Sequence, residues 1–187
     1  VIGDGTFLHS GLPSLMSAVY NRVPTTMILL DNGTTGMTGH QEHPGTGHTL
    51  QNAPAPAVDF ETLIRSIGVE HVTVMDPWEL KNLRGAVKAA LAHPGPAVVI
   101  TRRACVLLPE EKARDRTPYW VDEDACIQCD YCMESGCPAL VWAGDYPRVR
   151  DWECIGCAIC AQLCPVDAIL PVETDVEDEV GIPVEEA

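Results

Sequence analysis

The chain has 187 residues, with 12 Lys and Arg against 27 Asp and Glu, so its formal net charge is −15. An apolar fraction of 46% is ordinary for a globular protein and excludes disorder over most of the chain. The acidic balance argues against nucleic acid or an anionic membrane as a partner, and no stretch of about 18 apolar residues predicts a transmembrane helix. No charged and then apolar leader opens the chain, so we expect a cytoplasmic location.

The negative charge is concentrated toward the end of the chain. Residues 1–116 have a net charge of −1, residues 117–172 have −7, and residues 173–187 have a further −7. Eight of the nine cysteines fall in the middle of these segments. The composition therefore predicts two domains with a linker and a tail. The expected boundaries are 1–104 for the first domain, 105–120 for the linker, 121–172 for the second domain and 173–187 for a mobile acidic tail.

The first part alternates between strand-like and helix-like segments. Val1 and Ile2 precede a Gly turn without an initiator Met, which predicts the end of a strand that starts upstream. Gly68 is placed to end one helix, and Asp76-Pro77 to begin the next. This order predicts an α/β fold with a parallel sheet and right-handed crossovers. The predicted helices cover 12–20, 58–67 and 76–92, and the predicted strands cover 25–30, 71–75 and 96–101.

A Gly-Asp-Gly turn at residues 3–5 stands between the first strand and a helix. Backbone N–H groups at such a turn can hold a phosphate, and the helix N-terminus favours its charge. Asp31 and Asn32 end the next strand, so in a parallel sheet they reach the same carboxyl edge, where oxygen ligands could bind Mg²⁺. An N-capping Asp and a turn Asn without a ligand are the alternative. A nicotinamide site is disfavoured because Leu8 replaces the last glycine of G-x-G-x-x-G.

This spacing resembles the thiamine diphosphate motif, which reads Gly-Asp-Gly and, further along the chain, Asn-Asn or Asp-Asn. The resemblance implies that Asp4 and Asn32 bind Mg²⁺ through their side chains and that Thr34 binds it through its carbonyl. The residues then expected to contact the cofactor are Gly3, Asp4, Gly5, Thr6, Asn32 and Thr34.

The eight clustered cysteines form an internal repeat in which two C-x-x-C-x-x-C runs, starting at Cys126 and Cys154, each lead to a Cys-Pro pair. The second run has the spacing of bacterial two-cluster ferredoxins, in which the fourth cysteine serves the other cluster. The first run has one extra residue before its Cys-Pro. Disulfides or a four-cysteine zinc site are alternatives, but nothing indicates secretion and zinc does not explain the third cysteine of each run. We expect one [4Fe–4S] cluster on Cys126, Cys129, Cys132 and Cys164, and a second on Cys137, Cys154, Cys157 and Cys160.

Residues 121–172 resemble two-cluster ferredoxins, which transfer single electrons. Residues 3–11 and 30–47, taken together with residues 121–172, resemble the large (alpha) subunit of indolepyruvate:ferredoxin oxidoreductase. This resemblance covers nearly the whole chain. That resemblance implies a parallel-sheet thiamine-diphosphate-binding domain, truncated at its N-terminus, followed by a small α+β bacterial-type 2[4Fe–4S] ferredoxin domain.

The resemblance also implies a reaction, the oxidative decarboxylation of an aryl 2-oxo acid such as indolepyruvate to an acyl-CoA and CO₂. Its cofactors are thiamine diphosphate and Mg²⁺, and coenzyme A is the co-substrate. The oxidation releases two electrons, whereas a cluster accepts one at a time, so two clusters on the chain give the electrons a path to ferredoxin. The alternatives are a relative with another 2-oxo acid or an NAD-linked acceptor, and an electron-transfer subunit with a vestigial thiamine domain.

The Gly-rich loop 31–56 carries the candidate substrate contacts His40 and His43, which could bind a carboxylate or relay protons. Packing of the loop is the alternative for both. By the resemblance, the glutamate that activates the cofactor lies outside this chain, on a pyrimidine-binding domain or subunit. The other expected partners are a gamma-type (beta) subunit and, as electron acceptor, ferredoxin or a flavin subunit. Cys105 is expected to be a small buried residue without a ligand role.

Overall fold

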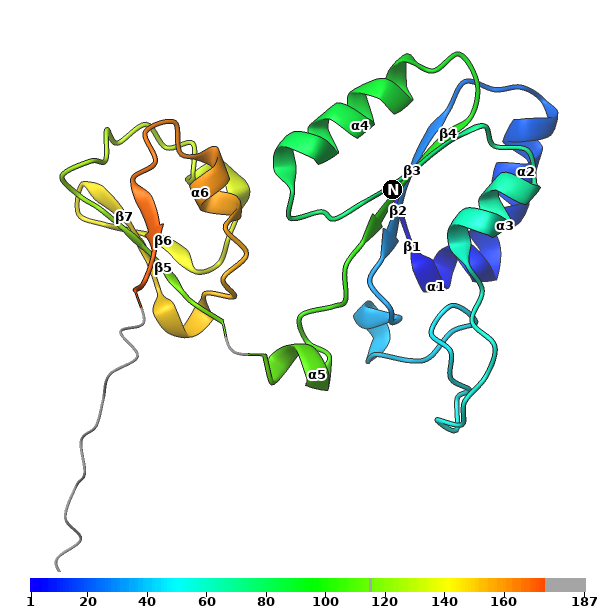
Figure 1. The fold of residues 1–187 in the computed structure, drawn as a ribbon, viewed down its shortest axis with the longest axis horizontal. Coiled ribbons are helices and arrows are strands. Elements are labelled where there is room, and N and C mark those ends of the chain that lie inside the picture. The colour runs from blue at the N-terminus through cyan, green and yellow to red at the C-terminus, as the bar shows by residue number, and fades with distance from the viewer. Residues whose placement is uncertain (115, 174–187) are drawn as a thin grey trace, which may run out of the picture. The chain divides into compact units, whose positions relative to one another are not determined.

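The computed structural model describes residues 1–114 and 116–173. The chain divides after Arg114 into two compact units (Figure 1). Within the described residues, no helix combines the length and the apolar character that crossing a bilayer requires. The predicted acidic tail lies, apart from Glu173, outside the described residues.

The first unit is built on a parallel sheet, which confirms the α/β prediction. β4 lies between β2 and β3 in this sheet and is buried from Ala97 to Thr101, which explains its continuous run of apolar residues. β1 and β2 are neighbours, with Gly3 opposite Leu30, so the residues that follow these strands meet at one edge. The strands are β1 (Ile2–Gly3), β2 (Thr26–Asp31), β3 (His71–Met75) and β4 (Ala97–Arg102), in the order β1-β2-β4-β3.

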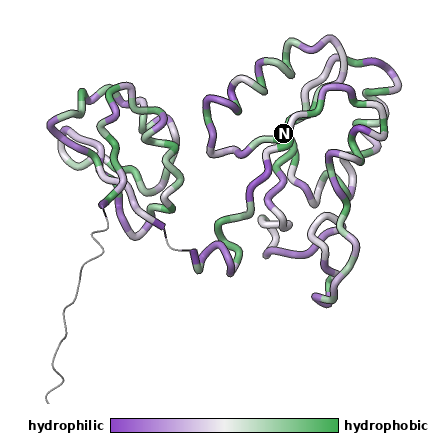
Figure 2. Tube along the Cα trace, in the orientation of Figure 1, coloured by the Kyte–Doolittle hydropathy of each residue, from purple (hydrophilic) through white to green (hydrophobic). Residues whose placement is uncertain are grey.

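Helices cover both faces of this sheet (Figure 1). Helices α2 (Leu12–Tyr20) and α3 (Phe60–Ser66) pack on one face, and α4 (Leu80–Ala92) packs on the other. Hydrophilic and hydrophobic residues alternate along α4, as expected for a helix that buries one face (Figure 2).

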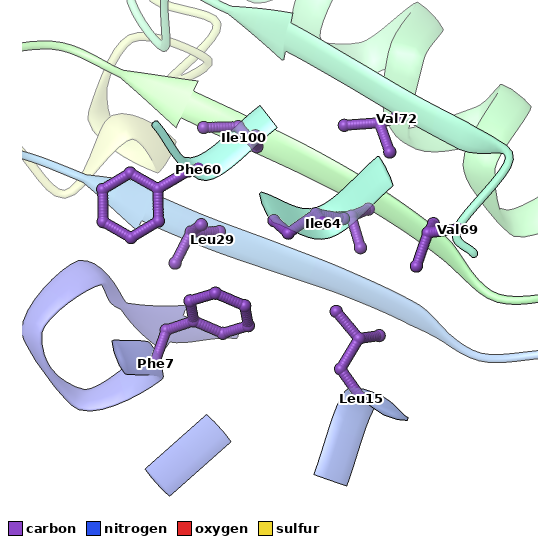
Figure 3. Packing of buried hydrophobic residues seen from close by; sticks show 9 residues of the cluster. Phe7, Leu15, Leu29, Phe60, Ile64, Val69, Val72 and Ile100 are labelled. Carbon is purple, nitrogen blue, oxygen red and sulfur yellow. The ribbon is translucent and has the colours of Figure 1, made fainter. Parts of the chain in front are cut away.

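Each face of the sheet has its own apolar core. Alternate side chains of a strand point to opposite faces, so neighbouring residues of β4 belong to different cores. The smaller core, under α4, contains Ala90, Ala97 and Val99. The larger core, under α2 and α3, consists of Phe7, Leu15, Leu29, Phe60, Ile64, Val69, Val72, Val98 and Ile100 (Figure 3).

The first helix begins earlier than the apolar spacing predicts. α1 (Asp4–Thr6) continues through a wider π-helical segment, η1 (Phe7–Gly11), into α2. Pro13 accounts for the wide segment, because a proline in a regular helix lacks the N–H and clashes with the carbonyl four residues earlier. As a result, Asp4 stands at the start of a helix that runs without a break to Tyr20.

The predicted start of α4 at Asp76-Pro77 is wrong, because the helix begins at Leu80. Asp76 instead closes a turn by accepting the N–H of Trp78 at 2.9 Å. Its carboxylate also forms an ion pair with Arg103, whose guanidinium lies 3.4 Å from the centre of the Trp78 ring. These contacts with the end of β4 are tertiary, so no local pattern predicts them.

The predicted helix over 58–67 is confirmed as α3, which is slightly shorter at both ends. Asp59 is its N-cap and accepts the N–H of Thr62 at 2.7 Å. Gly68 follows the helix at φ +98°, a conformation that glycine adopts without strain.

We expect Asp59→Ala to lower the free energy of unfolding by about 1 kcal/mol at pH 7, and Asp59→Asn to cost less, because Asn also caps helices. Hydrogen bonds from the side chain and then the backbone of Thr62 hold the pKa of Asp59 below its ordinary value of 3.8. A lowered folded-state pKa stabilises the fold above the unfolded-state pKa, and this contribution is lost as the pH falls through the folded-state pKa. Urea unfolding at pH 7 and near pH 3 should therefore show a smaller advantage of Asp59 over Asn at the lower pH.

The second unit is a small α+β domain, as predicted. It has two antiparallel strand pairs, β5 (Tyr119–Val121) with β8 (Ile169–Pro171) and β6 (Leu140–Ala143) with β7 (Tyr146–Val149). Its core is formed by Cys132, Leu140, Cys160 and Ile169. The short helical elements are η3 (Met133–Ser135), η4 (Asp151–Glu153) and α6 (Ile159–Leu163).

The segment 105–120, which the sequence predicts to be a linker, contains regular structure in its middle and at its end. A helical turn, α5 (Pro109–Lys112), belongs to the first unit, and β5 of the second unit begins at Tyr119. The connection between the units is therefore shorter than the predicted linker.

Candidate cofactor and cluster sites

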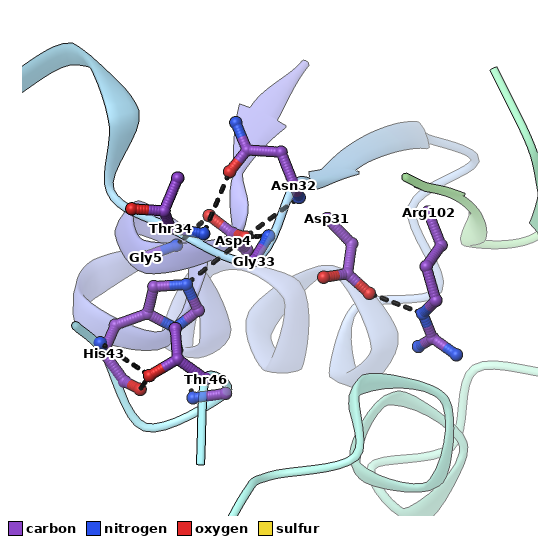
Figure 4. Close-up of polar contacts among 10 residues, drawn as sticks. Asp4, Gly5, Asp31, Asn32, Gly33, Thr34, His43, Thr46 and Arg102 are labelled. Atoms are coloured by element: carbon purple, nitrogen blue, oxygen red, sulfur yellow. Dashed lines mark hydrogen bonds and ion pairs between the residues drawn. The ribbon is translucent and has the colours of Figure 1, made fainter. Parts of the chain in front are cut away.

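Asp4 lies where β1 turns into α1, at the carboxyl edge of the sheet, and is 2% exposed. Its Oδ1 accepts the N–H of Gly5 at 2.7 Å (Figure 4). Its Oδ2 accepts the N–H groups of Asn32 at 3.0 Å and of Gly33 at 2.9 Å. These bonds offset the cost of burying a charge and tie the Gly-Asp-Gly turn to the end of β2.

Asn32 and Thr34 lie directly beside Asp4, as expected for residues that follow neighbouring parallel strands. The side-chain Oδ1 of Asn32 accepts the N–H of Thr34 at 3.1 Å, and Thr34 is buried. Asp31 points away from this group and binds Nε of Arg102 at 2.6 Å (Figure 4). The structure thus brings the three predicted Mg²⁺ ligands together and separates Asp31 from them.

The two candidate histidines of the long loop occupy different environments. His43 is buried, and its Nε2 lies 3.3 Å from Oδ2 of Asp4. His40 is half-buried at φ +64°, and its Nδ1 has no hydrogen-bond partner in the described part of the chain. A 3₁₀ turn, η2 (Gly36–Thr38), precedes His40. Only His43 therefore contacts a predicted Mg²⁺ ligand.

A cavity of about 520 Å³ opens beside the Gly-Asp-Gly turn. Its wall includes Gly5 and Thr6 of the first helical turn, where the N-terminus of the helix favours the charge of a phosphate. Thr35 and Glu42 also line it, and no sequence motif predicts either of them, because only the return of the loop brings them there. The complete lining is Gly5, Thr6, Leu8, His9, Thr35, Glu42, His43 and Pro44.

These residues fit thiamine diphosphate held through Mg²⁺. Asp4 is a buried carboxylate, and no Lys or Arg of the described residues forms an ion pair with it. A divalent cation would supply the missing positive charge, and the oxygens of Asp4, Asn32 and Thr34 are the hard ligands that Mg²⁺ prefers. Gly33, at φ +73° with open space where a Cβ would stand, lets the chain turn closely around Asp4.

The eight cysteines of the repeat fall into two groups within the second unit. One cavity is lined by the first three cysteines of the repeat together with the last, namely Cys126, Cys129, Cys132 and Cys164. Burial raises the pKa of the Cys132 thiol, and the cysteines that raise it further are Cys126 and Cys164. In this group the distal cysteine of the second run lies with the three cysteines of the first run.

The second group shows the same crossing. Burial raises the pKa of Cys157, and the neighbouring cysteines that add to it are Cys137 and Cys154. Burial, followed by repulsion from Cys157, raises the pKa of Cys160 to about 12, and Cys137 and Cys154 contribute again. Cys137, which comes from the first run, therefore lies with the second run.

The spacing of these thiols favours cubane clusters over single metal ions. Among the residues that the structure describes, no three His, Cys, Asp or Glu side chains are close enough to hold one ion. A zinc site needs four ligands around one metal with Zn–S distances of about 2.3 Å, whereas a cubane spreads its four cysteines over four irons.

The backbone repeats along with the cysteines. Gln128 and Asp130, on either side of Cys129, have φ values of 55° and 66°. Their equivalents in the second run, Gly156 and Ala158, have φ values of 66° and 58°. Left-handed residues of this kind turn successive N–H groups toward one point and form the concavities that hold anions and iron–sulfur clusters.

The extra residue of the first run is absorbed by a tighter turn. The segment from Cys132 to Cys137 forms η3 and then a left-handed residue, Gly136 at φ +62°, whereas the second run forms α6. Cys164 Sγ accepts the N–H of Ala168 at 3.2 Å, a type of contact that tunes the potential of a cluster.

We expect Gly156→Ala to reduce cluster content far more than Gly136→Ala. Both glycines have positive φ, which costs a residue with a Cβ about 1–2 kcal/mol. A Cβ at Gly156 would also lie 2.8 Å from the carbonyl oxygen of Thr117, whereas nothing lies within 4 Å at Gly136. Iron per chain and visible absorbance measure the difference, and equal losses in the two variants would contradict the steric explanation.

Together, these features define a class of protein: an α/β domain of the thiamine-diphosphate-binding type, joined to a two-cluster ferredoxin-type domain. Comparison with known proteins supports both halves. Residues 1–101 match the family model of the thiamine pyrophosphate enzyme C-terminal TPP binding domain, and residues 118–165 match the 4Fe-4S dicluster domain. The chain belongs to the thiamine pyrophosphate enzyme family.

Curated relatives confirm the resemblance seen in the sequence. The chain is 42% identical over 179 residues to the indolepyruvate oxidoreductase subunit IorA of Archaeoglobus fulgidus, covering 93% of this chain and 28% of the relative. It is 42% identical over 171 residues to the subunit of the same name from Methanothermobacter marburgensis, covering 91% of this chain and 27% of the relative. The chain thus spans little more than a quarter of either relative.

A solved structure supports the fold. The 2-oxoglutarate:ferredoxin oxidoreductase from Magnetococcus marinus, solved with 2-oxoglutarate, coenzyme A and succinyl-CoA bound, superposes with a TM-score of 0.52 at 24% sequence identity. The match covers 56% of this chain and 39% of that chain.

Proposed function

We propose that this chain is the cofactor-binding and electron-accepting part of a 2-oxoacid:ferredoxin oxidoreductase. The reaction is the oxidative decarboxylation of an aryl 2-oxo acid of the indolepyruvate type to an acyl-CoA and CO₂. The observation that carries the proposal is a buried carboxylate, Asp4, beside Asn32 at the carboxyl edge of a sheet, on the same chain as two crossed groups of four cysteines.

The chain's own residues would hold the cofactor and accept the electrons. Asp4, Asn32 and the carbonyl of Thr34 would bind Mg²⁺, while Gly3, Gly5 and Thr6 present the turn and helix start to the diphosphate. Thiamine diphosphate would supply the electron sink for loss of CO₂. The crossed cysteine groups would hold two [4Fe–4S] clusters, which take up electrons one at a time.

The proposed reaction needs groups that the described residues do not provide. The glutamate that activates the cofactor would come from a pyrimidine-binding domain or subunit, and a gamma-type (beta) subunit would complete the complex. Ferredoxin would take the electrons. The similarity of 38–42% to IorA subunits supports an indolepyruvate-type substrate over other 2-oxo acids.

The test is anaerobic purification of the complete enzyme, followed by EPR of the clusters as 2-oxo acids are added with and without coenzyme A. Arylpyruvates should reduce the clusters, and coenzyme A should increase turnover. Stronger reduction by a branched-chain 2-oxo acid or pyruvate would assign a related activity instead. If no 2-oxo acid reduces the clusters and the protein retains no thiamine diphosphate, the chain is an electron-transfer subunit without thiamine chemistry.

A further inference from the structure

The His43 ring is more deeply buried and more closely packed than contact with a substrate would require. Its side chain is 5% exposed, and its ring packs 6.4 Å, centre to centre, from Phe60 of the larger core. A Cβ on Gly45 would lie 3.1 Å from its Cε1, and a Cβ on Gly5 would lie 3.4 Å from its Cδ2. The ring is therefore enclosed by the core, by its own loop and by the Gly-Asp-Gly turn.

The hydrogen bonds of His43 fix the position of its proton. Nδ1 accepts the N–H of Gly45 at 3.1 Å, so Nδ1 carries no hydrogen and the proton lies on Nε2. Nε2 lies 3.3 Å from Oδ2 of Asp4 and has no hydrogen-bond partner of good geometry among the described residues. A buried donor without another partner thus faces the carboxylate of Asp4 (Figure 4).

The two oxygens of Asp4 are unequal. Oδ2 already accepts N–H groups from Asn32 and Gly33, which occupy its two lone pairs. The third donor, Nε2–H of His43, therefore does not point along a lone pair of Oδ2. It interacts with Oδ2 through the negative charge of the carboxylate. Among the residues that the structure describes, Oδ1 accepts the N–H of Gly5 alone and keeps one lone pair. Two backbone N–H groups and the nearby Nε2–H of His43 therefore hold Oδ2, and Oδ1 is the oxygen left for a cation.

We propose that His43 is a positioning residue for Asp4, which anchors the Oδ2 atom so that Oδ1 is presented to a divalent cation. This inference rests on the proposed function, because it takes Asp4 as a Mg²⁺ ligand. It replaces the expectation that His43 contacts the substrate. It also gives the long loop a role, because Gly45 of the loop, together with Phe60 of α3, holds the His43 ring beside the carboxylate of Asp4.

Three substitutions of His43 in the complete enzyme test the proposal. His43→Gln places an amide N–H₂ near the position of Nε2 and keeps a donor for Asp4. His43→Leu keeps apolar volume and removes the donor, and His43→Asn keeps a polar side chain that is too short to reach Oδ2. His48→Leu, on an exposed histidine of the same loop, is the matched control.

The measurement is the dissociation constant of Mn²⁺ in the presence of thiamine diphosphate, followed by EPR after removal of Mg²⁺ from enzyme with its clusters oxidised. We expect His43→Leu and His43→Asn to weaken Mn²⁺ binding about 10- to 100-fold, the range for loss of a partner that orients a metal ligand. His43→Gln should stay within about threefold of the unchanged enzyme, and so should His48→Leu. At saturating Mg²⁺ the KM for the 2-oxo acid should be unchanged in all four.

Each contrary result has a distinct meaning. Wild-type Mn²⁺ affinity in His43→Leu and His43→Asn would overturn the inference, and so would a Gln variant as weak as the Leu variant. A raised KM for the 2-oxo acid with unchanged Mn²⁺ affinity would return His43 to the substrate. Failure of the unchanged enzyme to bind Mn²⁺ with thiamine diphosphate would instead refute the proposed function itself.

Discussion

Removing Cys126 together with Cys164 should leave one intact iron–sulfur cluster in the chain, whereas removing Cys154 together with Cys164 should leave no cluster with its full set of four cysteines. The reason is the crossed grouping, in which Cys164 lies with Cys126 and Cys132 although it belongs to the second run. Loss of two ligands from one cubane should prevent its assembly, and the second cubane should keep all four of its own. The second double variant instead removes one ligand from each cubane, and a cluster with three cysteines can persist only in altered form.

Iron analysis and EPR of the anaerobically purified protein distinguish the two arrangements. The first double variant should hold roughly four irons per chain in one cluster with an unaltered EPR signal, and the unchanged protein roughly eight irons in two clusters. The second double variant should show no unaltered cluster signal. If each run instead bound its own cluster, the two results would be exchanged. Cys105→Ala is the control, because Cys105 lies in the first unit, and it should retain both clusters.

Much of the first unit follows from the sequence because its signals are local. Strands β2, β3 and β4 and helix α3 are found close to their predicted bounds, since each is an apolar or amphipathic run between turn residues. The errors occur where tertiary contacts override local signals. Asp76 is an ordinary N-cap candidate in the sequence, but Arg103, 27 residues away, holds it in a turn before α4.

The candidate sites show the same division. The meeting of Asp4 and Asn32 follows from parallel-strand topology, which places the ends of adjacent strands at one edge. The role of His43 cannot be predicted in this way, because it depends on how the loop folds back onto the Gly-Asp-Gly turn. The backbone N–H of Cys105 donates to the carbonyl of Asn32 at 2.9 Å, a further support for the Asn32 turn that no motif reveals.

The same substitution at two neighbouring strand ends should have opposite outcomes: Asp4→Asn should abolish cofactor binding, and Asp31→Asn should leave it intact. Asp4 is buried, and its two oxygens accept three backbone N–H groups. An Asn there keeps one oxygen, so its N–H₂ must face an N–H donor, most easily that of Gly5. Such an unpaired buried donor costs about 1–3 kcal/mol.

The larger effect of Asp4→Asn should fall on the cation, because the oxygen presented to it is replaced by an amide without charge. We expect the affinity for Mg²⁺ and thiamine diphosphate to fall by at least about 100-fold, beyond the usual effect of losing an outer-shell partner. Asp31 instead pairs with Arg102, whose side chain is 45% exposed, so its loss should cost less than about 1 kcal/mol. Equilibrium dialysis of thiamine diphosphate with Mg²⁺ measures both variants in the complete enzyme. Equal affinities in the two variants would mean that the buried carboxylate stabilises the turn and does not hold the metal.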